Sequence, residues 1–483
     1  MLKKILDKYK ELPISVKATI WFFICTFLQK SLTFITTPIF TRLLTTEEYG
    51  KFSVFTSWLS IATAVISMNM YSGMYVQGLV KFDKKREEYA AANQGLCFTL
   101  TVIWTFIYLL FKDFFNATFS LNTVQMLAMI LIVWTSSVYS FWSVEQRVDL
   151  KYRKFVILTI AVSIIKPAIG IFLVIFSDDK VTARIVGIAI VEFIAYFWIF
   201  IYEIRKGKKF FSYKIWKYVL SVCIPLIPHY LSLSALTGAD RIMIENMVGE
   251  SEAGIYSLSY SVSMIMSVVN TALLQTVEPW LYKKIKAREA KAISGIAYSL
   301  FIMVAVVNLV LIAFAPEVIA IFAPAEYYDA IYIIPPVAMS VFFMFMYSFY
   351  AVFEFYYEKT KLISVATVVG ALLNIGLNYI FINIFGYYAA GYTTLACYIL
   401  TAVFHYCVMR KICKKYLDNV QVYETKKILA ISVVFMVAGF LLLSTYASML
   451  VRYIIIVLLL ILMLIKRKRI IELIKKIVAI KKM

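Results

Sequence analysis

The chain has 483 residues, of which 62% are hydrophobic and 16% charged, and its formal net charge is +21. A soluble chain carries about 25% charged residues, and one globular core cannot bury this much apolar surface. These values exclude a soluble protein and predict an all-α, polytopic protein of an inner or plasma membrane. The first apolar stretch, residues 15–40, is too long for a cleavable signal peptide and is expected to remain as a span.

Apolar runs that are long enough to cross a hydrocarbon core of about 30 Å recur along the whole chain. The sequence predicts fourteen spans, at residues 15–40, 52–76, 91–111, 121–144, 155–176, 183–202, 217–238, 254–280, 295–315, 331–357, 362–384, 388–409, 427–446 and 449–465. The connectors are too short for a soluble catalytic domain, and none carries a phosphate-binding loop, a GxGxxG motif or an HExxH motif. We therefore expect no enzyme, no cofactor and no metal site.

Basic residues gather in alternate connectors. With a cytoplasmic N-terminus, 39 of the 49 Lys and Arg residues fall in cytoplasmic segments and 7 in external ones, while Lys17, Lys30 and Lys166 lie within spans. Short cytoplasmic loops of membrane proteins carry such an excess. The asymmetry predicts that both termini are cytoplasmic, and it explains the net charge without a nucleic-acid partner.

The ends of the chain and its cysteines also fit a membrane protein. Residues 466–483 combine a basic start with apolar residues on one helical face, which predicts an amphipathic helix on an anionic leaflet, and residues 2–9 show the same pattern on a smaller scale. Five of the six cysteines lie in apolar segments and none forms a CxxC pair. We interpret them as small apolar side chains of helices rather than as disulfides or metal ligands.

A short motif occurs twice in the chain. The pattern Glu-x-Gly-x-aromatic-Ser at Glu48–Ser53 recurs at Glu252–Ser257, with an offset of 204 residues. Each copy opens the second span of a six-span set, so both copies run in the same direction. The sequence therefore predicts two six-helix lobes related by a pseudo-two-fold axis along the membrane normal. We expect them at residues 1–210 and 211–415, followed at 416–483 by two additional helices and the basic tail.

The motif residues have structural explanations. Glu48 and Glu252 stand where a carboxylate can accept hydrogen bonds from the free N–H groups of a first helical turn. Gly50 and Gly254 permit a tight and closely packed turn. We interpret all four as a structural repeat motif rather than as substrate contacts.

Span 1 carries a polar stripe. Lys30 lies near the middle of the span, on one helical face with Thr26, Thr33 and Thr37. Hydroxyls alone could join helices through hydrogen bonds, but an unpaired ammonium at mid-bilayer costs several kcal/mol. We therefore expect this face to line a wet central cavity, in which Lys30 attracts an anionic headgroup.

Two further mid-span charges allow alternative interpretations. Lys166 lies in span 5, directly before Pro167, and Glu192 lies in span 6. They could form a structural ion pair between adjacent spans of one lobe. Alternatively, Lys166 could be a second cation of the cavity, and Glu192 could couple transport to an ion. The sequence leaves both interpretations open.

Span 7 holds a predicted bend and two candidate residues. Pro225 and Pro228 interrupt the helical hydrogen bonds within four residues, which predicts a bending element. His229 follows and could carry a proton or serve as a structural side chain of the cavity. Arg241, with Asp240 at the expected outer end of the span, could anchor at the interface or bind substrate.

Two glutamates lie toward the cytoplasmic ends of later spans. Glu278 precedes Pro279 in span 8, and Glu354 lies in span 10. Either could couple transport to protons. We favour structural partners such as Lys283 or Lys359 for both.

Several segments together resemble a known family. The run from Pro38 to Gly50 resembles the signature at the first external turn of bacterial polysaccharide flippases. The segments Pro225–Pro228, Asp240–Ile244 and Gly254–Ser257 resemble the signature of the second lobe. The family is the Wzx-type flippase for O-antigen and capsule repeat units. It belongs to the superfamily of the multidrug and toxic compound extruders (MATE) and the peptidoglycan-precursor flippases.

The resemblance implies a function. A protein of this family would move undecaprenyl-diphosphate-linked oligosaccharide from the inner to the outer leaflet by alternating access, and a cationic cavity would hold the diphosphate and the sugars. Lys30, Lys166 and Arg241 are the positions in this sequence that could supply those cations. Membrane lipids and the polymerase and glycosyltransferases of the pathway are the expected partners.

Two other function classes are weaker alternatives. One is a small-molecule exporter of the same fold that is coupled to Na⁺ or H⁺, or another flippase of the superfamily that carries peptidoglycan or teichoic precursors. The intramembrane lysines and the two additional spans argue against the exporter. The other is a membrane polymerase or ligase, which would need a large external loop rich in Arg and His. This chain has two histidines and no such loop.

Overall fold

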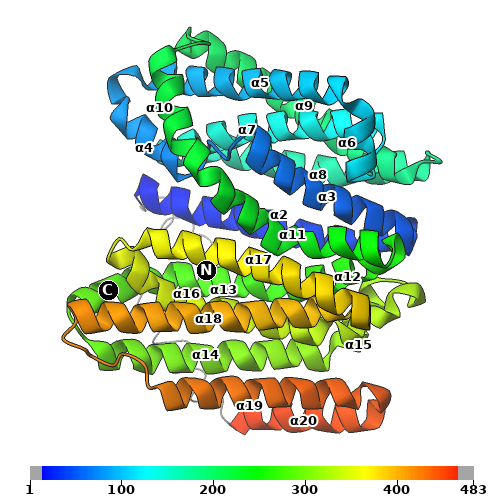
Figure 1. Ribbon diagram of the computed structural model, residues 1–483, viewed down its shortest axis with the longest axis vertical. Coiled ribbons are helices and arrows are strands. Elements are labelled where there is room, and N and C mark those ends of the chain that lie inside the picture. The colour runs from blue at the N-terminus through cyan, green and yellow to red at the C-terminus, as the bar shows by residue number, and fades with distance from the viewer. Residues whose placement is uncertain (1–12, 466–483) are drawn as a thin grey trace, which may run out of the picture. The chain divides into compact units, whose positions relative to one another are not determined.

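The computed structural model describes residues 13–465 (Figure 1). Every regular element in this part of the chain is a helix, so the predicted all-α class is confirmed. The predicted amphipathic segments at residues 2–9 and 466–483 lie outside the described residues. The chain divides into two compact units, Met1–Ala239 (unit 1) and Asp240–Met483 (unit 2), with the boundary inside one helix.

Unit 1 consists of long helices that run side by side, joined by short turns (Figure 1). Its elements are α2 (Ile14–Leu43), α3 (Thr46–Ile66), α4 (Gly73–Lys81), the 3₁₀ turn η1 (Asp83–Lys85), α5 (Arg86–Leu110), α6 (Lys112–Phe119), α7 (Thr123–Val148), α8 (Tyr152–Ile175), α9 (Lys180–Gly207), α10 (Tyr213–Cys223), η2 (Ile224–Leu226) and the first part of α11 (Ile227–Met247).

Unit 2 contains the rest of α11 and a second set of helices. These are α12 (Glu250–Ser263), α13 (Ile265–Lys286), α14 (Ala290–Ala313), α15 (Ala315–Phe322), η3 (Ala325–Tyr332), α16 (Ile334–Tyr356), α17 (Thr360–Phe385), α18 (Ala389–Tyr416), α19 (Thr425–Ser444), η4 (Thr445–Ala447) and α20 (Met449–Ile465). The helix α16 is the most deeply buried of the candidate spans, with α18 packed along it.

Within residues 13–465, twelve helical segments are long and apolar enough to cross a membrane. The other two predicted spans are helical as well: residues 52–76 fall in α3 and α4, and residues 449–465 form α20. Every predicted span therefore corresponds to helix. The protein is a multi-pass membrane protein.

The second span of unit 1 is not one helix, as the sequence suggested, but two. The helix α3 ends at Ile66, and α4 begins at Gly73. Between them Met68 and Asn69 adopt left-handed backbone conformations, with φ of 50° and 45°. The corresponding span of unit 2 is also divided, because α12 ends at Ser263 and α13 begins at Ile265. A break in the second span is thus common to both units.

The proline pair produces the predicted break in span 7. The 3₁₀ turn η2, which contains Pro225, separates α10 from α11, and Pro228 lies in the first turn of α11. The expected end of this span is wrong, however. Asp240 and Arg241 do not end the helix, because α11 continues to Met247.

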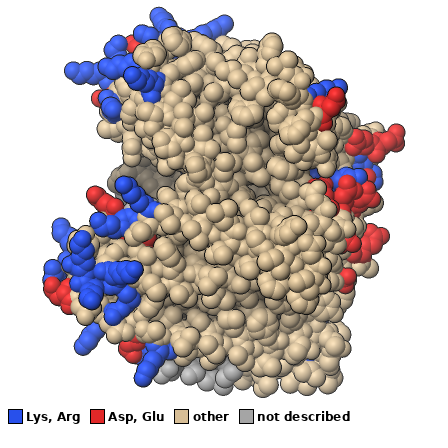
Figure 2. All heavy atoms as spheres, viewed as in Figure 1, with Lys and Arg blue, Asp and Glu red and all other residues tan. Residues whose placement is uncertain are grey.

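Each unit, taken by itself, has a basic end. Most Lys and Arg side chains gather at one end of the helices, whereas Asp and Glu side chains occur at both ends (Figure 2). We call the end rich in Lys and Arg the basic end. It comprises residues 81–86, 147–154 and 205–217 of unit 1 and residues 283–291, 359–361 and 410–427 of unit 2. This separation follows from the alternation of basic connectors in the sequence.

The last two helices are tied to unit 2 by a buried ion pair. Arg452 of α20 is 4% exposed and pairs with Glu317 of α15. The hydroxyl of Tyr453 donates to the same Glu317 oxygen at 2.9 Å, and the hydroxyl of Tyr446 donates to the carbonyl oxygen of Ile312 at 2.5 Å. The hairpin of α19 and α20 is therefore held by specific polar contacts as well as by apolar packing.

Candidate functional site

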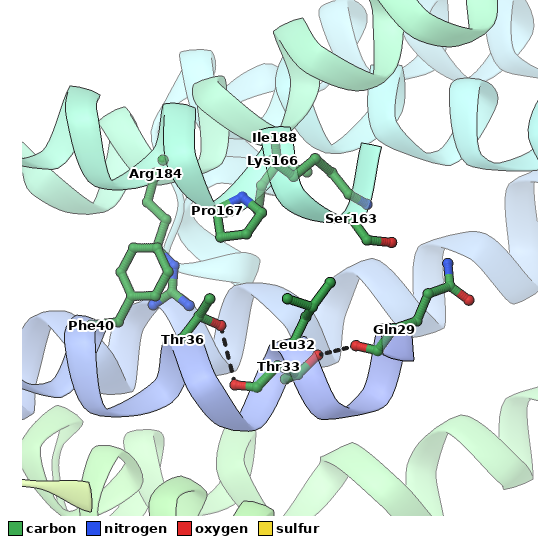
Figure 3. Close-up of a pocket in the computed structure, with 11 residues that line it drawn as sticks. Gln29, Leu32, Thr33, Thr36, Phe40, Ser163, Lys166, Pro167, Arg184 and Ile188 are labelled. Carbon is green, nitrogen blue, oxygen red and sulfur yellow. Dashed lines mark hydrogen bonds between the residues drawn. The ribbon is translucent and has the colours of Figure 1, made fainter. Parts of the chain in front are cut away.

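A cavity of about 300 Å³, lined by polar and apolar residues, lies between α2, α8 and α9 in unit 1 (Figure 3). Its volume is at the lower end of the range for small-molecule sites. The side chains that line it are Gln29, Leu32, Thr33, Thr36 and Phe40 of α2, Ser163, Lys166, Pro167 and Gly170 of α8, and Arg184 and Ile188 of α9. The cavity therefore combines two cationic residues with an amide, three hydroxyls and one aromatic ring.

The threonines of α2 are satisfied within their own helix. Thr33 donates to the carbonyl oxygen of Gln29 at 3.3 Å, and Thr36 and Thr37 donate to that of Thr33 at 3.1 and 2.8 Å. Such back-bonding lets a hydroxyl lie in an apolar helix at little cost. Because a hydroxyl oxygen has two lone pairs, Thr33 and Thr36 can still accept a hydrogen bond from a group in the cavity.

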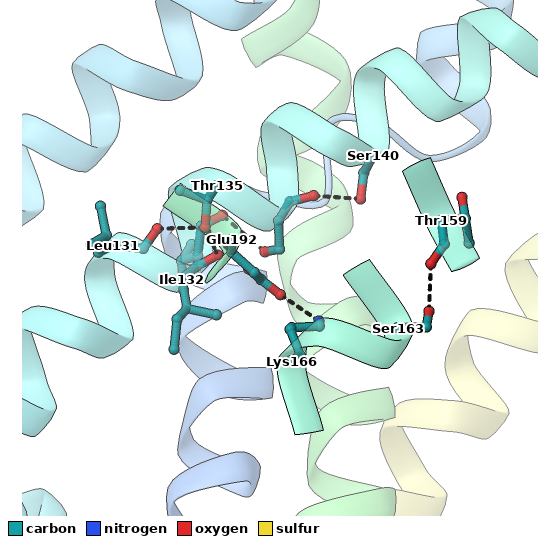
Figure 4. A network of polar contacts seen from close by, with 10 residues as sticks. Leu131, Ile132, Thr135, Ser140, Thr159, Ser163, Lys166 and Glu192 are labelled. Carbon is teal, nitrogen blue, oxygen red and sulfur yellow. Dashed lines mark hydrogen bonds and ion pairs between the residues drawn. The ribbon is translucent and has the colours of Figure 1, made fainter. Parts of the chain in front are cut away.

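Lys166 and Glu192 form the ion pair that was one of the two interpretations of the sequence (Figure 4). The Lys166 Nζ lies 2.7 Å from Glu192 Oε1, and Thr135 of α7 donates to Glu192 Oε2 at 3.1 Å. The Glu192 side chain is 6% exposed, whereas that of Lys166 is 31% exposed and lines the cavity. The ammonium can therefore face a ligand while the carboxylate behind it offsets its charge.

Arg184 is a cavity residue that the sequence did not single out. Its guanidinium carbon lies 3.6 Å from the ring centroid of Phe40 and 3.5 Å from that of Phe52. Cation–π contacts of this kind contribute about 0.5–2 kcal/mol each, and they fix the guanidinium plane. The sequence held a weak signal for this contact, because Arg184 is a charged residue near the start of one predicted span and Phe40 is the last residue of another. Only the fold shows that the two side chains meet.

This arrangement suits one kind of chemistry. The cavity offers a planar cation on aromatic rings, a neutralised ammonium, and amide and hydroxyl groups that both donate and accept. The cavity can therefore bind an anionic or hydroxyl-rich group through charge-assisted and neutral hydrogen bonds.

Lys30 does not line this cavity. It is exposed, as are Thr26 and Thr33 of the predicted stripe, while Thr37 is buried. Within residues 13–465, Lys30 has no recorded hydrogen bond or ion pair. The structure thus leaves it as an accessible charge on α2, near Gln29 of the cavity.

Asp240 and Arg241 have different environments in unit 2. The Arg241 guanidinium carbon lies 4.7 Å from the ring centroid of Tyr260. Asp240 is 2% exposed, and its carboxylate accepts hydrogen bonds from Tyr256 at 2.6 Å, Asn378 at 2.6 Å and Thr394 at 3.0 Å. These donors come from α12, α17 and α18, so Asp240 joins four helices. Sequence reasoning missed this network.

The remaining candidates are placed as follows. His229 lies in the first turn of α11 beside Tyr230, and its Nδ1 is buried without a hydrogen-bond partner among the described residues. Glu278 accepts a hydrogen bond from Tyr282 of its own helix at 2.9 Å. The expected lysine partner of Glu354 is wrong, because its carboxylate pairs with His405.

The two copies of the repeat motif both begin a helix. Thr45 and Glu48 form a capping box, in which Thr45 accepts from the Glu48 N–H at 3.1 Å and Glu48 accepts from the Thr45 N–H at 2.9 Å. In the second copy Gly249 occupies the N-cap of α12, and the Glu252 carboxylate lies against it. Gly50 and Gly254, one turn into each helix, are buried.

Two curated proteins and several solved structures are similar to this chain. A protein of the Lsg locus of Haemophilus influenzae is 22% identical over 374 residues, which cover 71% of this chain and 86% of that protein. A membrane protein of the same organism is 24% identical over 362 residues, covering 72% and 85%.

Among solved structures, the lipid II flippase MurJ in an inward closed conformation superposes with a TM-score of 0.67. It is 16% identical and covers 93% of this chain and 100% of its own. An inward-facing MATE-family multidrug transporter of the MOP superfamily gives a TM-score of 0.58 at 14% identity, covering 80% of this chain and 96% of its own. These two structures confirm the MATE-like fold.

The sequence itself identifies the family. Residues 15–284, more than half of the chain, match the family described as polysaccharide biosynthesis protein. The match agrees with the resemblance of the Pro38–Gly50 and Pro225–Ser257 segments to polysaccharide flippases. The chain therefore belongs to the polysaccharide biosynthesis protein family, with the fold of the MOP-superfamily flippases and extruders.

Proposed function

We propose that this protein moves undecaprenyl-diphosphate-linked oligosaccharide repeat units from the inner to the outer leaflet for O-antigen or capsule synthesis, by alternating access. The observation that carries the proposal is the cavity of unit 1, in which Lys166, Arg184 and three hydroxyls gather in a member of a polysaccharide biosynthesis family. Cations and hydroxyls within a span are rare and often mark the path of a substrate. In addition to their partners within the protein, these groups can offer charge-assisted hydrogen bonds to a sugar phosphate.

The cargo sets the physical requirement. A diphosphate with attached sugars cannot cross hydrocarbon unaided, so a carrier must offer it polar groups along the way. We propose Lys30, Lys166 and Arg241 as cations on this path, with Arg184 beside them. Since Glu192 offsets Lys166, we expect Lys30 and Arg184 to contribute most of the attraction.

The MurJ structure covers more of this chain than the MATE structure does, and this difference supports a lipid-linked cargo rather than a small molecule. The MATE transporter matches over 96% of its own length but leaves a fifth of this chain unmatched, whereas MurJ matches over 93% of this chain. We propose two six-helix lobes, residues 1–210 and 211–415, with residues 416–483 as the addition that distinguishes a flippase from an extruder. In this proposal the protein lies in the bacterial plasma membrane beside its polymerase and glycosyltransferases.

A reconstitution experiment tests the cargo. Purified protein in liposomes should expose a fluorescent polyprenyl-diphosphate oligosaccharide to a membrane-impermeant quencher faster than empty liposomes do. The variant Lys30→Gln/Arg184→Gln, which leaves the Lys166–Glu192 pair intact, should slow this exposure at least tenfold while its melting temperature stays close to that of the wild type. Movement of a cationic dye or of lipid II alone would contradict the proposal and favour the extruder or the peptidoglycan-precursor flippase.

A second experiment tests Lys30. If its charge attracts the diphosphate, Lys30→Arg should retain partial export in cells and Lys30→Ala should lose it, because arginine supplies the charge with a different donor geometry. Both variants should remain stably folded, since Lys30 is exposed. Export at the wild-type level by a folded Lys30→Ala variant would show that the charge of Lys30 is not needed to bind the diphosphate.

A further inference from the structure

Unit 1 has a long apolar face that no other part of the described chain covers. It follows the second half of α5 and continues onto α6. Asn116 holds α6 in place, because it accepts a hydrogen bond from Tyr108 of α5 at 3.0 Å and donates to Thr123 of α7 at 3.2 Å. We call this face the α5–α6 stripe. Its side chains are 42–72% exposed, and they are Val102, Ile103, Phe106, Leu109, Leu110, Phe111 and Phe114.

The internal repeat identifies the equivalent face of unit 2. A shift of 204 residues, the offset between the two motif copies, carries α5 onto α14 and α6 onto α15, to within one residue at each end. The exposure of the equivalent side chains differs, however. Leu109 is 54% exposed, whereas Ala313 is 1% exposed. Phe111 is 59% exposed, whereas Ala315 is 0% exposed. The face that is open in unit 1 is therefore closed in unit 2.

The hairpin of α19 and α20 closes this face in unit 2. The helix α19 packs along α14, and Tyr446 in the turn of the hairpin donates to the carbonyl oxygen of Ile312. Arg452 of α20 pairs with Glu317 of α15. The same shift of 204 residues makes Asp113 of α6 the equivalent of Glu317. Asp113 is exposed, and among the described residues it has no recorded ion pair or hydrogen bond. The stripe of unit 1 thus lacks both its covering helix and the cation that this helix would bring.

Unit 1 differs from unit 2 by a cation beside this carboxylate. Lys112 precedes Asp113, whereas Pro316 precedes Glu317. Lys112 is also exposed, without a recorded ion pair among the residues that the structure describes. Lipid covers apolar side chains as well as a helix does, so the stripe alone does not identify an occupant. The two charges do, because a surface with adjacent opposite charges is complementary to its own copy across a two-fold axis.

From these observations we infer that the α5–α6 stripe binds the same stripe of a second copy of this chain. Two copies in one membrane have the same orientation, so the two-fold axis lies along the membrane normal and the two α5 helices run parallel. Lys112 of each copy pairs with Asp113 of the other. Exposed ion pairs contribute little stability, so the charges set the register while apolar packing supplies most of the contact. The inference concerns assembly and does not depend on the proposed cargo.

Cysteine cross-linking in membranes tests the contact. In the full-length chain without its native cysteines, Phe106→Cys places a thiol in the middle of the stripe, and oxidation with copper phenanthroline should link two copies. Phe172→Cys in α8 is the matched control, because Phe172 is 57% exposed and Phe106 is 67% exposed. We expect several-fold less dimer from the control. Equal cross-linking at both positions, or none at either, would overturn the inference and show that lipid alone covers the stripe.

Exchange of the charges tests the register. Asp113→Lys sets lysine against lysine and Lys112→Asp sets carboxylate against carboxylate, so each should lower the cross-linked fraction of Phe106→Cys several-fold. The double variant Lys112→Asp/Asp113→Lys restores opposite charges and should recover the original fraction. All variants should elute as folded protein in size-exclusion chromatography, since both residues are exposed. An unchanged fraction in the single variants, or a double variant as low as they are, would overturn the two-fold arrangement.

Discussion

At the scale of single residues, Asp240 stands out because its carboxylate accepts hydrogen bonds from side chains of three other helices. Tyr256, Asn378 and Thr394 donate to its two oxygens. A carboxylate surrounded by donors fixes the positions of the helices that carry them, because each donor would be left unpaired if its helix moved. We therefore regard Asp240 as the main polar connection among α11, α12, α17 and α18.

Replacing Asp240 with alanine should destabilise the protein strongly. The change leaves up to three buried donors without an acceptor, at about 1–3 kcal/mol for each. Thermal unfolding in detergent should show a melting temperature lower by at least about 5 °C. Asp113→Ala, which removes an exposed carboxylate with no recorded partner, should melt like the wild type. Equal melting of the two variants would show that the network contributes little.

The Lys166–Glu192 pair predicts a rescue. Lys166→Ala should lower the free energy of unfolding by about 3 kcal/mol, because it leaves the Glu192 carboxylate buried without its counter-charge. The value is at the low end for a buried pair because Lys166 itself is partly exposed. Adding Glu192→Gln removes that charge and should restore most of the loss. Thermal unfolding of the wild type, both single variants and the double variant measures the coupling. A double variant as unstable as Lys166→Ala would contradict a structural pair.

Sequence alone indicated some of these residues and not others. Lys166 and Glu192 were visible because charges are rare in the middle of apolar spans. Asn378 left a weaker signal, because it is an amide in an apolar helix, and nothing in the sequence linked it to Asp240. The Glu354–His405 contact joins residues 51 positions apart, and only tertiary packing could pair them.

At the scale of elements, the breaks in the second spans matter most. The sequence predicted one helix over residues 52–76, because Met68 is not typical of a helix end and no proline follows it, although Asn69 was a weak signal of the break. By contrast, the break before α11 was predictable, since Pro225 and Pro228 remove two backbone donors. Hydropathy predicts how long an apolar span is. Whether the helix breaks within the span depends on tertiary packing, which hydropathy does not show.

The junction of α9 with α5 depends on a glycine. A Cβ atom at Gly207 would lie 2.2 Å from the carbonyl oxygen of Glu87, which no side-chain movement can relieve. Gly207→Ala should therefore force α5 and α9 apart and lower the melting temperature by several degrees. Gly376→Ala is the matched control, because a Cβ there meets nothing within 4 Å and improves helix propensity. Similar melting of both variants would contradict the tight junction.

At the scale of the whole molecule, the fold class and twelve of the fourteen predicted spans followed from the sequence, and the other two predicted spans are helical within the described residues. Long apolar runs can cross a bilayer only as helices that satisfy their own backbone, so composition and run length were sufficient. The helix ends were less predictable. The helix α18 extends to Tyr416, beyond the expected end at residue 409, because helices continue into polar residues that hydropathy excludes.

The orientation of the molecule is a further prediction at this scale. In a cysteine-free background, Asp178→Cys and Glu326→Cys should react with an impermeant thiol reagent added outside, whereas Lys208→Cys and Lys414→Cys should react only after the cells are opened. The physical reason is the excess of Lys and Arg at the basic ends. External labelling at Lys208→Cys would show that the predicted topology is wrong, and the two-lobe repeat would then lose its support.

The ion pair between Arg452 and Glu317 has a consequence for biosynthesis. The two residues are 135 positions apart, so Glu317 leaves the ribosome long before its partner does. At about 5–20 residues per second, the delay is roughly 7–27 seconds. During that time α15 carries a carboxylate with no counter-charge from α20. Unit 2 therefore cannot complete this packing until α20 has been synthesised, and a ribosome that stalls after α19 would leave an inserted chain that is open to membrane proteases.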